Sequence, residues 1–474
     1  PKRTRARAEE SPATNVPRGR RHARSGPDGG ASGQPPAQRR RVEEAPAGPQ
    51  WNLTTAVEEV LLAGFDVTEQ MTLNDFIRRY VDPDFVLEGR NVMMGVFARR
   101  PEHYIRDEWL LGEILNSQAY QLLEDARNLR ADARNLAVQG VSSLDQWKEF
   151  EHKDTVTLLA KGKLDRALAV AKRAERSAWI QRIVSQPLPE GFYNSVLNAK
   201  WSHVLGFPEG EGDAMVVRME VRQGQTPTQL WDYRRKGISY EPVEDALQFI
   251  APRPRLLVLT SEKGWPYSLK QRGAFADCYI NYEVERVWRI VKGDLEGEFG
   301  TADLKGFDVR RRLLIGTPGI GKSMAAGSYL LYRLLHYDIA KLQVVVYCFG
   351  GDLAFVFDKE EQTVTAHGGE LNVINVMNDL VWQRKLKGYV IYDVDKKGEE
   401  TSKYFPPHET WGIIVLSSPN ETNYKGWEKQ MFAKRIIMNC PDELDVKAMC
   451  VWERRVEPAE AQAERWETVK KVHG

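Results

Sequence analysis

The sequence predicts an α/β fold in which a P-loop NTPase-type parallel sheet core lies at the C-terminal side, preceded by a helical region and a disordered basic tail. Three observations predict it. Apolar strands alternate with helical patterns in the last third, long amphipathic patterns precede them, and the N-terminal segment has almost no large apolar residues. We therefore expect a disordered basic tail (1–50), a helical N-terminal region (51–184), a mixed α+β module (185–300) and a P-loop NTPase-like domain (301–474).

The expected tail differs from the rest of the chain in composition and charge. The chain has 474 residues and a net charge of +1, but residues 1–50 hold 11 Lys and Arg against 5 Asp and Glu. Such a segment buries too little apolar surface to offset its ordering entropy. Its clusters Arg18–Arg24 and Arg39–Arg41 are candidates for a nuclear-import signal or for contacts with nucleic-acid phosphates, and a simple solvated tail is the alternative.

Cysteine usage and hydropathy narrow the class of protein. The four cysteines, Cys278, Cys348, Cys440 and Cys450, form no C-x-x-C pair, which argues against a disulfide framework or a zinc site. Isolated cysteines fit a reducing compartment, the cytosol or the nucleus. No apolar run approaches the ~20 residues that a membrane span needs, so no membrane partner is expected.

Helical periodicity dominates the second part of the chain. Short blocks at Val57–Leu61 and Leu73–Tyr80 place apolar residues at helical spacing. Two longer amphipathic stretches follow, Ser117–Val138 and Thr155–Val184, with Gly140 between them. A helical hairpin or small bundle is therefore expected here, and we interpret its apolar positions as packing residues.

Prolines, glycines and short apolar runs replace the helical pattern after residue 184. Strands are expected at Ala214–Val221, Gln229–Tyr233 and Arg255–Thr260, where strand-forming residues are bounded by turn residues. A helical pattern returns over Tyr279–Val291. This part is therefore predicted to be a β-containing module that ends in a helix.

A glycine-rich loop with a lysine follows. A short strand, Arg311–Ile315, runs into the letters G-T-P-G-I-G-K-S, and a long helical pattern, Met324–Tyr337, comes next. This is the Walker A pattern G-x-x-x-x-G-K-S in the strand-to-helix setting that confirms the motif. Glycines let backbone N–H groups curl around phosphate oxygens, and the helix N-terminus adds partial positive charge. We therefore predict that ATP or GTP binds at Gly316, Thr317, Pro318, Gly319, Ile320, Gly321, Lys322 and Ser323.

A metal site is predicted beside this loop. Lys322 would reach the β- and γ-phosphates, and the hydroxyl of Ser323 would bind Mg²⁺. The apolar strand Gly388–Asp393 ends in an acid and follows the loop after an intervening strand at Leu342–Cys348, which is the form of a Walker B strand. Ser323 and Asp393 are therefore the predicted metal ligands.

The remaining patterns predict a parallel sheet with helices on both faces. A hairpin near Phe355–Thr365 and a helix over Leu371–Trp382 precede the strand that ends at Asp393. Apolar runs within Trp411–Asn420 and Arg435–Asn439 come later, and a helix over residues 442–454 follows them. Ligand would then lie at the carboxyl ends of the parallel strands.

The sequence defines catalysis less sharply than binding. Many P-loop ATPases carry Glu directly after the strand-end Asp, but Val394 follows Asp393 here. The catalytic candidates are Asp393, Asp395 and Asn420. Asn420 or its neighbour Ser418 would sense the γ-phosphate, as in many ring-type ATPases, or would simply form a turn. Further candidates, to activate water or to act as arginine fingers, are Glu421, Arg435, Arg454 and Arg455.

Three functions are compatible with these patterns. The first is a Mg²⁺-dependent nucleoside triphosphate-binding protein, with ATPase activity left open, that acts in complexes on chromatin or RNA. The second is a non-hydrolysing interaction protein that is switched by its nucleotide. The third, a small-molecule phosphotransferase, is disfavoured because no acceptor-site constellation accompanies the P-loop.

Four separated blocks of the chain agree, in order, with one known family. The blocks are R-P-R-L-L-V-L-T-S-E-K-G-W-P-Y-S (253–268), L-L-I-G-T-P-G-I-G-K-S-M-A-A-G-S-Y-L-L-Y (313–332), V-L-S-S-P-N-E-T-N-Y (415–424) and M-N-C-P-D-E-L-D-V-K-A-M-C-V-W (438–452). They closely resemble the retrotransposon hot spot proteins of trypanosomes. The resemblance extends from about Trp109 onward and is weakest over the tail.

This resemblance has functional implications. The family is a multigene set similar to ATP/GTP-binding proteins, found in nuclear, perinuclear or cytoplasmic locations, and some members are associated with transcription and RNA export. The resemblance implies the P-loop role for Gly316, Gly321, Lys322 and Ser323. It favours the nucleus, with the cytoplasm as a second location. The basic tail is the expected contact for nucleic acid or nuclear protein complexes, and the oligomeric state stays open. Family members often continue past the position of Gly474.

Overall fold

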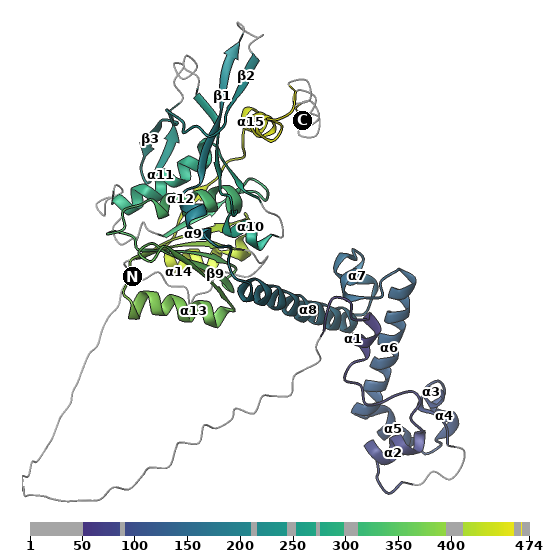
Figure 1. Ribbon diagram of the computed structural model, residues 1–474. Coiled ribbons are helices and arrows are strands. Elements are labelled where there is room, and N and C mark those ends of the chain that lie inside the picture. The colour runs from purple at the N-terminus through teal and green to yellow at the C-terminus, as the bar shows by residue number, and fades with distance from the viewer. Residues whose placement is uncertain are drawn as a thin grey trace, which may run out of the picture. The chain divides into compact units, whose positions relative to one another are not determined.

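The computed structural model describes residues 51–85, 91–209, 216–243, 253–271, 275–297, 311–394, 411–458 and 466. The expected tail, with its arginine clusters, and Asp395 lie outside these residues. The elements below all belong to one unit, Trp51–Gly474 (Figure 1). None of the helices in the described ranges is long and apolar enough to cross a bilayer.

Helices make up most of the described chain up to Ser185. They are α1 (Val57–Leu62), α2 (Leu73–Tyr80), α3 (Met94–Phe97), α4 (Pro101–Tyr104), α5 (Glu108–Asn116), α6 (Gln118–Val138), α7 (Leu144–Glu149) and α8 (Leu158–Ser185). The helix expected from Thr155 begins at Leu158 instead. The reason is local, because Lys153–Thr155 forms a short 3₁₀ turn and the side chain of Thr157 caps α8 by accepting the N–H of Ala160.

An antiparallel four-stranded sheet comes next, in the order β2–β1–β5–β6. Its strands are β1 (Lys200–Glu209), β2 (Val216–Arg222), β5 (Arg253–Thr260) and β6 (Asp277–Ile280), and its helices are α9 (Phe192–Leu197), α10 (Pro266–Lys270) and α11 (Tyr282–Glu296). The strand expected at Gln229–Tyr233 begins only at Tyr233, in a separate hairpin of β3 (Tyr233–Lys236) with β4 (Ser239–Pro242). The helix expected from Tyr279 begins at Tyr282, because Tyr279 pairs with Val258 in the sheet.

The C-terminal part is a seven-stranded sheet in the order β10–β9–β8–β11–β12–β7–β13. Its strands are β7 (Arg311–Ile315), β8 (Val344–Phe349), β9 (Leu353–Asp358), β10 (Thr363–Gly368), β11 (Gly388–Asp393), β12 (Gly412–Ser417) and β13 (Lys434–Ile437). The five strands β8, β11, β12, β7 and β13 are parallel to their neighbours in the sheet. Strand β9 is antiparallel to β8, and β10 is antiparallel to β9. The predicted parallel sheet is therefore present at the centre, and the hairpin predicted near Phe355–Thr365 is the antiparallel pair of β9 and β10 at one edge. There Gly350 and Gly351, with φ values of 61° and 80°, reverse the chain in a turn too short for a parallel crossover.

Helices cover both faces of this sheet, as its alternating pattern predicts. They are α12 (Ser328–Leu335), α13 (Glu370–Asn378) and α14 (Lys425–Met431), and π-helical turns lie at Lys322–Gly327 and Asp379–Gln383. Neighbouring side chains of β7 point to opposite faces, since Leu314 packs with residues of α12 and Leu313 with residues of α13 and α14. Figure 1 shows α12 and α13 on opposite sides of the sheet. Burial on both faces explains the continuous apolar runs of the central strands.

The antiparallel and seven-stranded sheets share apolar packing. Trp288 of α11 lies in one buried cluster with Leu314 of the loop-bearing strand. In the opposite direction, α15 (Glu443–Glu453) places Trp452 against Val258 of the antiparallel sheet. The two sheets therefore pack against each other through both α11 and α15. The domain boundary expected near residue 300 stays a prediction.

Candidate functional site

The chain leaves the carboxyl end of β7 and turns tightly from Gly316 to Gly321. Gly319 and Gly321 have φ values of 87° and 93°, a region that residues with a Cβ rarely adopt. At Gly316 a Cβ would lie 2.4 Å from Cδ1 of Ile320, which packs against the core. All three glycines of the predicted motif are therefore required by the path of the loop itself.

A π-helical turn, Lys322–Gly327, follows the loop. Buried side chains from two other strands bond to its carbonyl oxygens. Tyr347 Oη of β8 donates to Ser323 O at 2.8 Å, and Cys278 Sγ of β6 donates to Ala325 O at 3.4 Å. Such turns are frequent at functional positions, and this one is held in place by both sheets of the molecule.

Lys322 lies folded back over the loop. Its Nζ donates to the carbonyl oxygens of Gly316 and Thr317, both at 2.6 Å, and 9% of the residue is exposed. Burial lowers the pKa of Lys322, and the negative charge of Asp393 opposes that shift. An ammonium bonded only to neutral carbonyls in this way gains stronger, charge-assisted bonds if it exchanges them for the oxygens of an anion.

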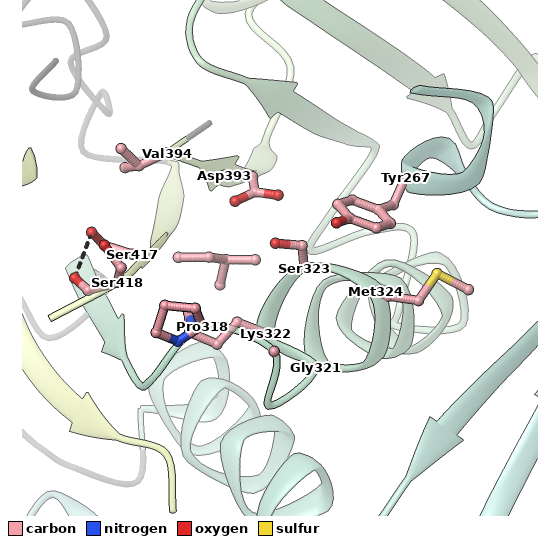
Figure 2. Close-up of a pocket in the computed structure, with 12 residues that line it drawn as sticks. Tyr267, Pro318, Gly321, Lys322, Ser323, Met324, Asp393, Val394, Ser417 and Ser418 are labelled. Atoms are coloured by element: carbon pink, nitrogen blue, oxygen red, sulfur yellow. Dashed lines mark hydrogen bonds between the residues drawn. The ribbon is translucent and has the colours of Figure 1, made fainter. Parts of the chain in front are cut away.

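A cavity of about 290 Å³ opens beside Lys322, at the carboxyl ends of the parallel strands. Asp393 ends β11 and is 6% exposed, and Figure 2 shows its carboxylate on the same side of the cavity as Ser323. Strand β12 lies between β7, which leads into the loop, and β11, which ends at Asp393. Ser417 ends β12 and Ser418 follows it, so both lie at the strand end between those of β7 and β11. The lining residues are Tyr267, Pro318, Gly319, Gly321, Lys322, Ser323, Met324, Asp393, Val394, Leu416, Ser417 and Ser418.

Two other predicted residues, Asn420 and Glu421, do not line this cavity. The Oδ1 of Asn420 accepts the backbone N–H of Thr422 at 3.2 Å, so it forms the turn that was the alternative interpretation. Ser418, the other candidate sensor, does line the cavity. Glu421 forms an exposed ion pair with Lys425 at 2.5 Å.

The three candidate arginine fingers also have other partners. Arg435 and Arg454 each pair with a nearby glutamate. The guanidinium of Arg455 lies 4.1 Å from the ring centre of Trp452. None of the three lines the cavity, so among the described residues its charged side chains are one lysine and one aspartate.

The oxygen ligands beside the π-helical turn fit a hard divalent cation. A hydroxyl and a carboxylate are ligands that Mg²⁺ prefers, usually together with substrate phosphates and waters. In the described ranges, no group of three or more His, Cys, Asp or Glu is placed to hold a metal ion by itself. Ser323 and Asp393 are therefore suited to a metal that arrives with a polyphosphate, which is how the sequence predicts their use.

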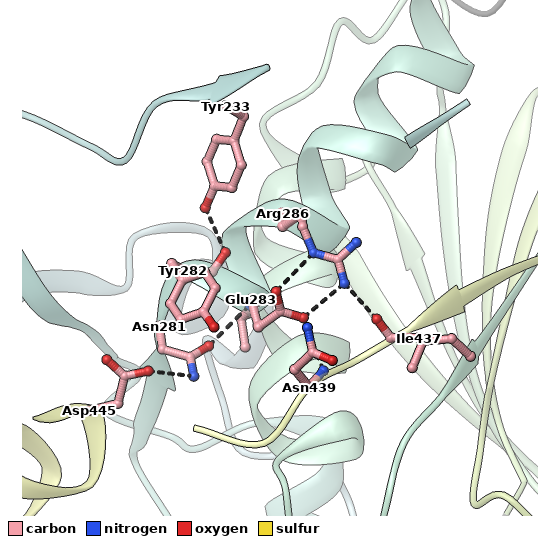
Figure 3. Close-up of polar contacts among 9 residues, drawn as sticks. Tyr233, Asn281, Tyr282, Glu283, Arg286, Ile437, Asn439 and Asp445 are labelled. Atoms are coloured by element: carbon pink, nitrogen blue, oxygen red, sulfur yellow. Dashed lines mark hydrogen bonds and ion pairs between the residues drawn. The ribbon is translucent and has the colours of Figure 1, made fainter. Parts of the chain in front are cut away.

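Helix α11, which follows the antiparallel sheet, makes buried polar contacts with the strands around the P-loop. Figure 3 shows its buried Glu283, which accepts Arg286 at 2.8 and 3.0 Å and the N–H of Asn439 at 3.0 Å. Arg286 in turn donates to the carbonyl of Ile437, at the end of β13. The buried Glu283–Arg286 ion pair of α11 thus holds the backbone from Ile437 to Asn439, which lies beside Gly316.

Two further acids of α11 reach the strand and the helix of the P-loop. Asp294 binds Arg312 of β7 through two bonds of 2.6 and 2.7 Å, and each side chain is 1% exposed. Glu285 accepts the hydroxyl of Tyr329 from α12. Burial, reinforced by the charge of Glu285, raises the pKa of Tyr329 well above its usual value. Sequence reasoning missed these contacts because acids within a polar-looking helix show no local sign of burial.

The fold and the site together define a P-loop domain, with a strand, a glycine loop, a lysine and a strand-end acid on one edge of a mainly parallel sheet. Comparison with protein families agrees. The description "Retrotransposon hot spot protein, P-loop domain" matches residues 313–473, and "Retrotransposon hot spot proteins N-terminal" matches residues 193–304. The chain belongs to the retrotransposon hot spot protein family, which confirms the resemblance of the four sequence blocks. A domain of unknown function (DUF7578) matches residues 67–130, and no curated protein matches the chain.

Proposed function

We propose that this protein binds a nucleoside triphosphate, ATP or GTP, together with Mg²⁺. The observation that carries the proposal is the presence of Lys322, Ser323 and Asp393 around one cavity at the carboxyl end of the sheet. Backbone N–H groups of the loop and Lys322 would bind the β- and γ-phosphate oxygens. Ser323 and Asp393 would hold Mg²⁺, which supplies positive charge against the phosphates.

We further propose that the nucleotide acts as a switch rather than as a rapidly consumed substrate. Hydrolysis needs a group that orients or activates water. Among the described residues, Asp393 is the acid of the cavity and is assigned to the metal, whereas Asn420 and Glu421 lie away from it. This arrangement favours slow turnover, with the bound nucleotide controlling the interactions of the protein.

Equilibrium binding of labelled ATP and GTP to the full chain tests the binding proposal. Lys322→Ala is expected to weaken binding about 10- to 100-fold, because a bond to a charged group contributes about 1.5–3 kcal/mol. Asp393→Ala should weaken binding in Mg²⁺ but not in EDTA. The matched control is Lys429→Ala, which removes an exposed lysine of α14. Failure of the wild-type chain to bind either nucleotide would contradict the proposal.

Phosphate release under the same conditions separates the switch from an ATPase. We expect release that is slow compared with nucleotide exchange. Asp395→Ala is the informative variant, because Asp395 is the remaining acid that the sequence nominates for water activation. Steady turnover that disappears in Asp395→Ala would establish an ATPase instead of a slow switch.

We also propose that the protein acts in nuclear complexes with nucleic acid or other proteins. The support is the basic N-terminal segment and the family membership. Replacing Arg39, Arg40 and Arg41 with Ala should reduce nuclear accumulation of the tagged chain in cells. An unchanged distribution would reject the import role of this cluster.

A further inference from the structure

Tyr347 of β8 makes a polar contact with the residue that is assigned to the metal. It is fully buried, and its Oη donates to the carbonyl oxygen of Ser323 at 2.8 Å. Strand β8 lies next to β11, and their register pairs Tyr347 with Ile391, close to Asp393 at the strand end. A side chain from outside the glycine loop therefore holds one predicted metal ligand and belongs to the strand beside the other.

The π-helical turn leaves room for this phenol. Gly327 ends the turn, and a Cβ there would lie 2.0 Å from Tyr347 Oη and 2.8 Å from Tyr347 Cζ. The backbone of Gly327 is ordinary right-handed helix, with a φ of −63° and a ψ of −45°, which residues with a Cβ adopt readily. Glycine at this position is therefore explained by the close approach of Tyr347 and not by the path of the chain.

The phenol is held as a hydrogen-bond donor. Its ring stacks on that of Phe349, with centres 4.5 Å apart and an angle of 22° between the planes. Burial, reinforced by the charge of Asp393, raises the pKa of Tyr347 well above its usual value, so the phenol keeps its proton. Because a carbonyl oxygen can only accept, that proton is directed to Ser323 before any ligand binds.

A contact of this kind matters most for the metal. Mg²⁺ demands near-ideal octahedral geometry, with ligand oxygens at about 2.0–2.1 Å. The carbonyl and the hydroxyl of Ser323 belong to one residue, so a bond that fixes the first restricts the position of the second. Groups that orient a metal ligand in this way contribute to metal affinity although they do not touch the ion.

We propose that Tyr347 is a positioning residue for the metal: by holding the backbone of Ser323, it places the hydroxyl of that residue for the Mg²⁺ that accompanies the nucleotide. This inference rests on the proposed function. The bond is made to Ser323, whereas Lys322, which is assigned to the phosphates, is held by other contacts. Loss of the bond should therefore reduce the Mg²⁺-dependent part of nucleotide affinity and leave the metal-independent part unchanged.

The test measures the affinity of the full chain for labelled ATP, in Mg²⁺ and in EDTA, for the wild type and for Tyr347→Phe. The substitution removes the hydroxyl and keeps the stacked ring. We expect the affinity in Mg²⁺ to fall about 10-fold, as for the loss of a group that orients a metal ligand, and the affinity in EDTA to stay within about 2-fold.

A double-mutant cycle with Ser323→Ala shows whether the phenol acts through the serine. If it does, Tyr347→Phe causes no further loss of affinity in Mg²⁺ once the serine hydroxyl has been removed. Losses that multiply would show that Tyr347 supports binding independently of Ser323, and they would overturn the inference.

The matched control is Tyr389→Phe. Tyr389 lies in the neighbouring strand β11 and is also fully buried, but its hydroxyl has no hydrogen-bond partner in the described part of the chain. This variant should change neither affinity. Urea unfolding curves of all variants identify conditions in which each is fully folded, so that the affinities report binding and not folding.

The outcomes separate the inference from the proposed function. If Tyr347→Phe weakens binding equally in Mg²⁺ and in EDTA, or changes neither, the inference is overturned while nucleotide binding stands. If the wild-type chain binds ATP equally well in Mg²⁺ and in EDTA, the metal assignment fails and the inference fails with it. If the wild-type chain binds no ATP, the proposed function fails as a whole.

Discussion

The P-loop sheet and the antiparallel module meet at one cavity but contribute to it in different ways. In the P-loop sheet the candidate binding residues are local. Most follow one another in the chain from Gly316 to Ser323, and Asp393 and Ser417 end strands. In the module, Tyr267, Cys278 and three acids of α11 come from separate elements and act on backbone or side chains far away in sequence. Binding groups can be encoded in a motif, whereas the groups that position them depend on how the sheets pack.

The contacts of α11 show why this packing is specific. Three of its acids each meet a different element of the P-loop part: β7, α12 and the end of β13. Buried ion pairs add little net stability relative to apolar packing, but breaking one is costly because the remaining charge is left without a partner. Four substitutions test how contacts between different parts of the molecule support the fold and the candidate site. They are given from the largest expected effect to the smallest.

Asp294→Ala is expected to have the largest effect on stability. It leaves the guanidinium of Arg312 buried without its carboxylate, which typically costs about 3–5 kcal/mol. The free energy of unfolding in urea measures the loss. A double variant, Asp294→Leu with Arg312→Leu, should recover much of it, because no charge then stays buried. The control, Lys236→Ala, removes one partner of an exposed pair with Glu241 and should leave stability unchanged. If Asp294→Ala and this control change the free energy of unfolding equally, the buried Asp294–Arg312 pair does not stabilise the packing of α11 on β7.

Gly327→Ala tests the support of the π-helical turn. Its new Cβ would lie 2.0 Å from Tyr347 Oη, the group that donates to Ser323 O. Overpacking of a buried site typically costs about 1–3 kcal/mol, and displacement of Tyr347 should also weaken ATP binding. Urea unfolding and ATP titration measure the two effects. Adding Tyr347→Phe removes the clashing oxygen and should restore part of the stability; if it restores none, the steric explanation is wrong.

Asp445 gives a pH-dependent test of the packing between α15 and the antiparallel module. Burial, with the charge of Asp442, raises the pKa of Asp445 to about 7, and Asn281 donates to its carboxylate at 3.2 Å (Figure 3). The folded chain therefore binds this proton more tightly than the unfolded chain. The stability that this group contributes is complete below about pH 4 and is lost as the pH rises to about 7.

Urea midpoints of the wild type and Asp445→Asn, measured from pH 4 to pH 8, follow this contribution. The wild type should lose stability relative to Asp445→Asn as the pH rises through this range, and the difference should level off above it. A difference that does not depend on pH would show that Asp445 does not titrate between the two states.

Arg176→Met should have the smallest effect. Arg176 of α8 donates to both oxygens of Asp352 at 2.6 and 2.7 Å, and the two side chains are 19% and 15% exposed. Because water still reaches both side chains, unlike those of Arg312 and Asp294, we expect a smaller loss of about 1 kcal/mol. Asp352 follows the turn in which the N–H of Gly350 donates to Asp393 O at 2.9 Å, so ATP affinity should fall only slightly. A drop as large as that of Lys322→Ala would show that the helical region controls the metal-side acid.

Strand positions in the P-loop sheet follow from the sequence to a useful degree. The strands predicted at Arg311–Ile315 and Gly388–Asp393 have those bounds in the structure, because buried parallel strands are continuous apolar runs. The strand expected at Gln229–Tyr233 is displaced, because exposed hairpins lack such a run. Asn420 follows the end of a strand, as a sensor residue would, but its side chain accepts the backbone N–H of Thr422 and forms a turn.

By itself the sequence determined the P-loop, its lysine and serine, and the acid at the end of a central strand. These depend on short-range rules, since glycines, strand ends and a helix start lie within a few residues of one another. Only the tertiary structure decided that β12 lies between the P-loop strand and the strand of Asp393, that β9 pairs with β8, that α11 contacts the strand and helix of the P-loop, and that Tyr267 lines the cavity. The physical reason is that these contacts join residues far apart in the chain, and their energy appears only when both sheets bury their shared apolar faces.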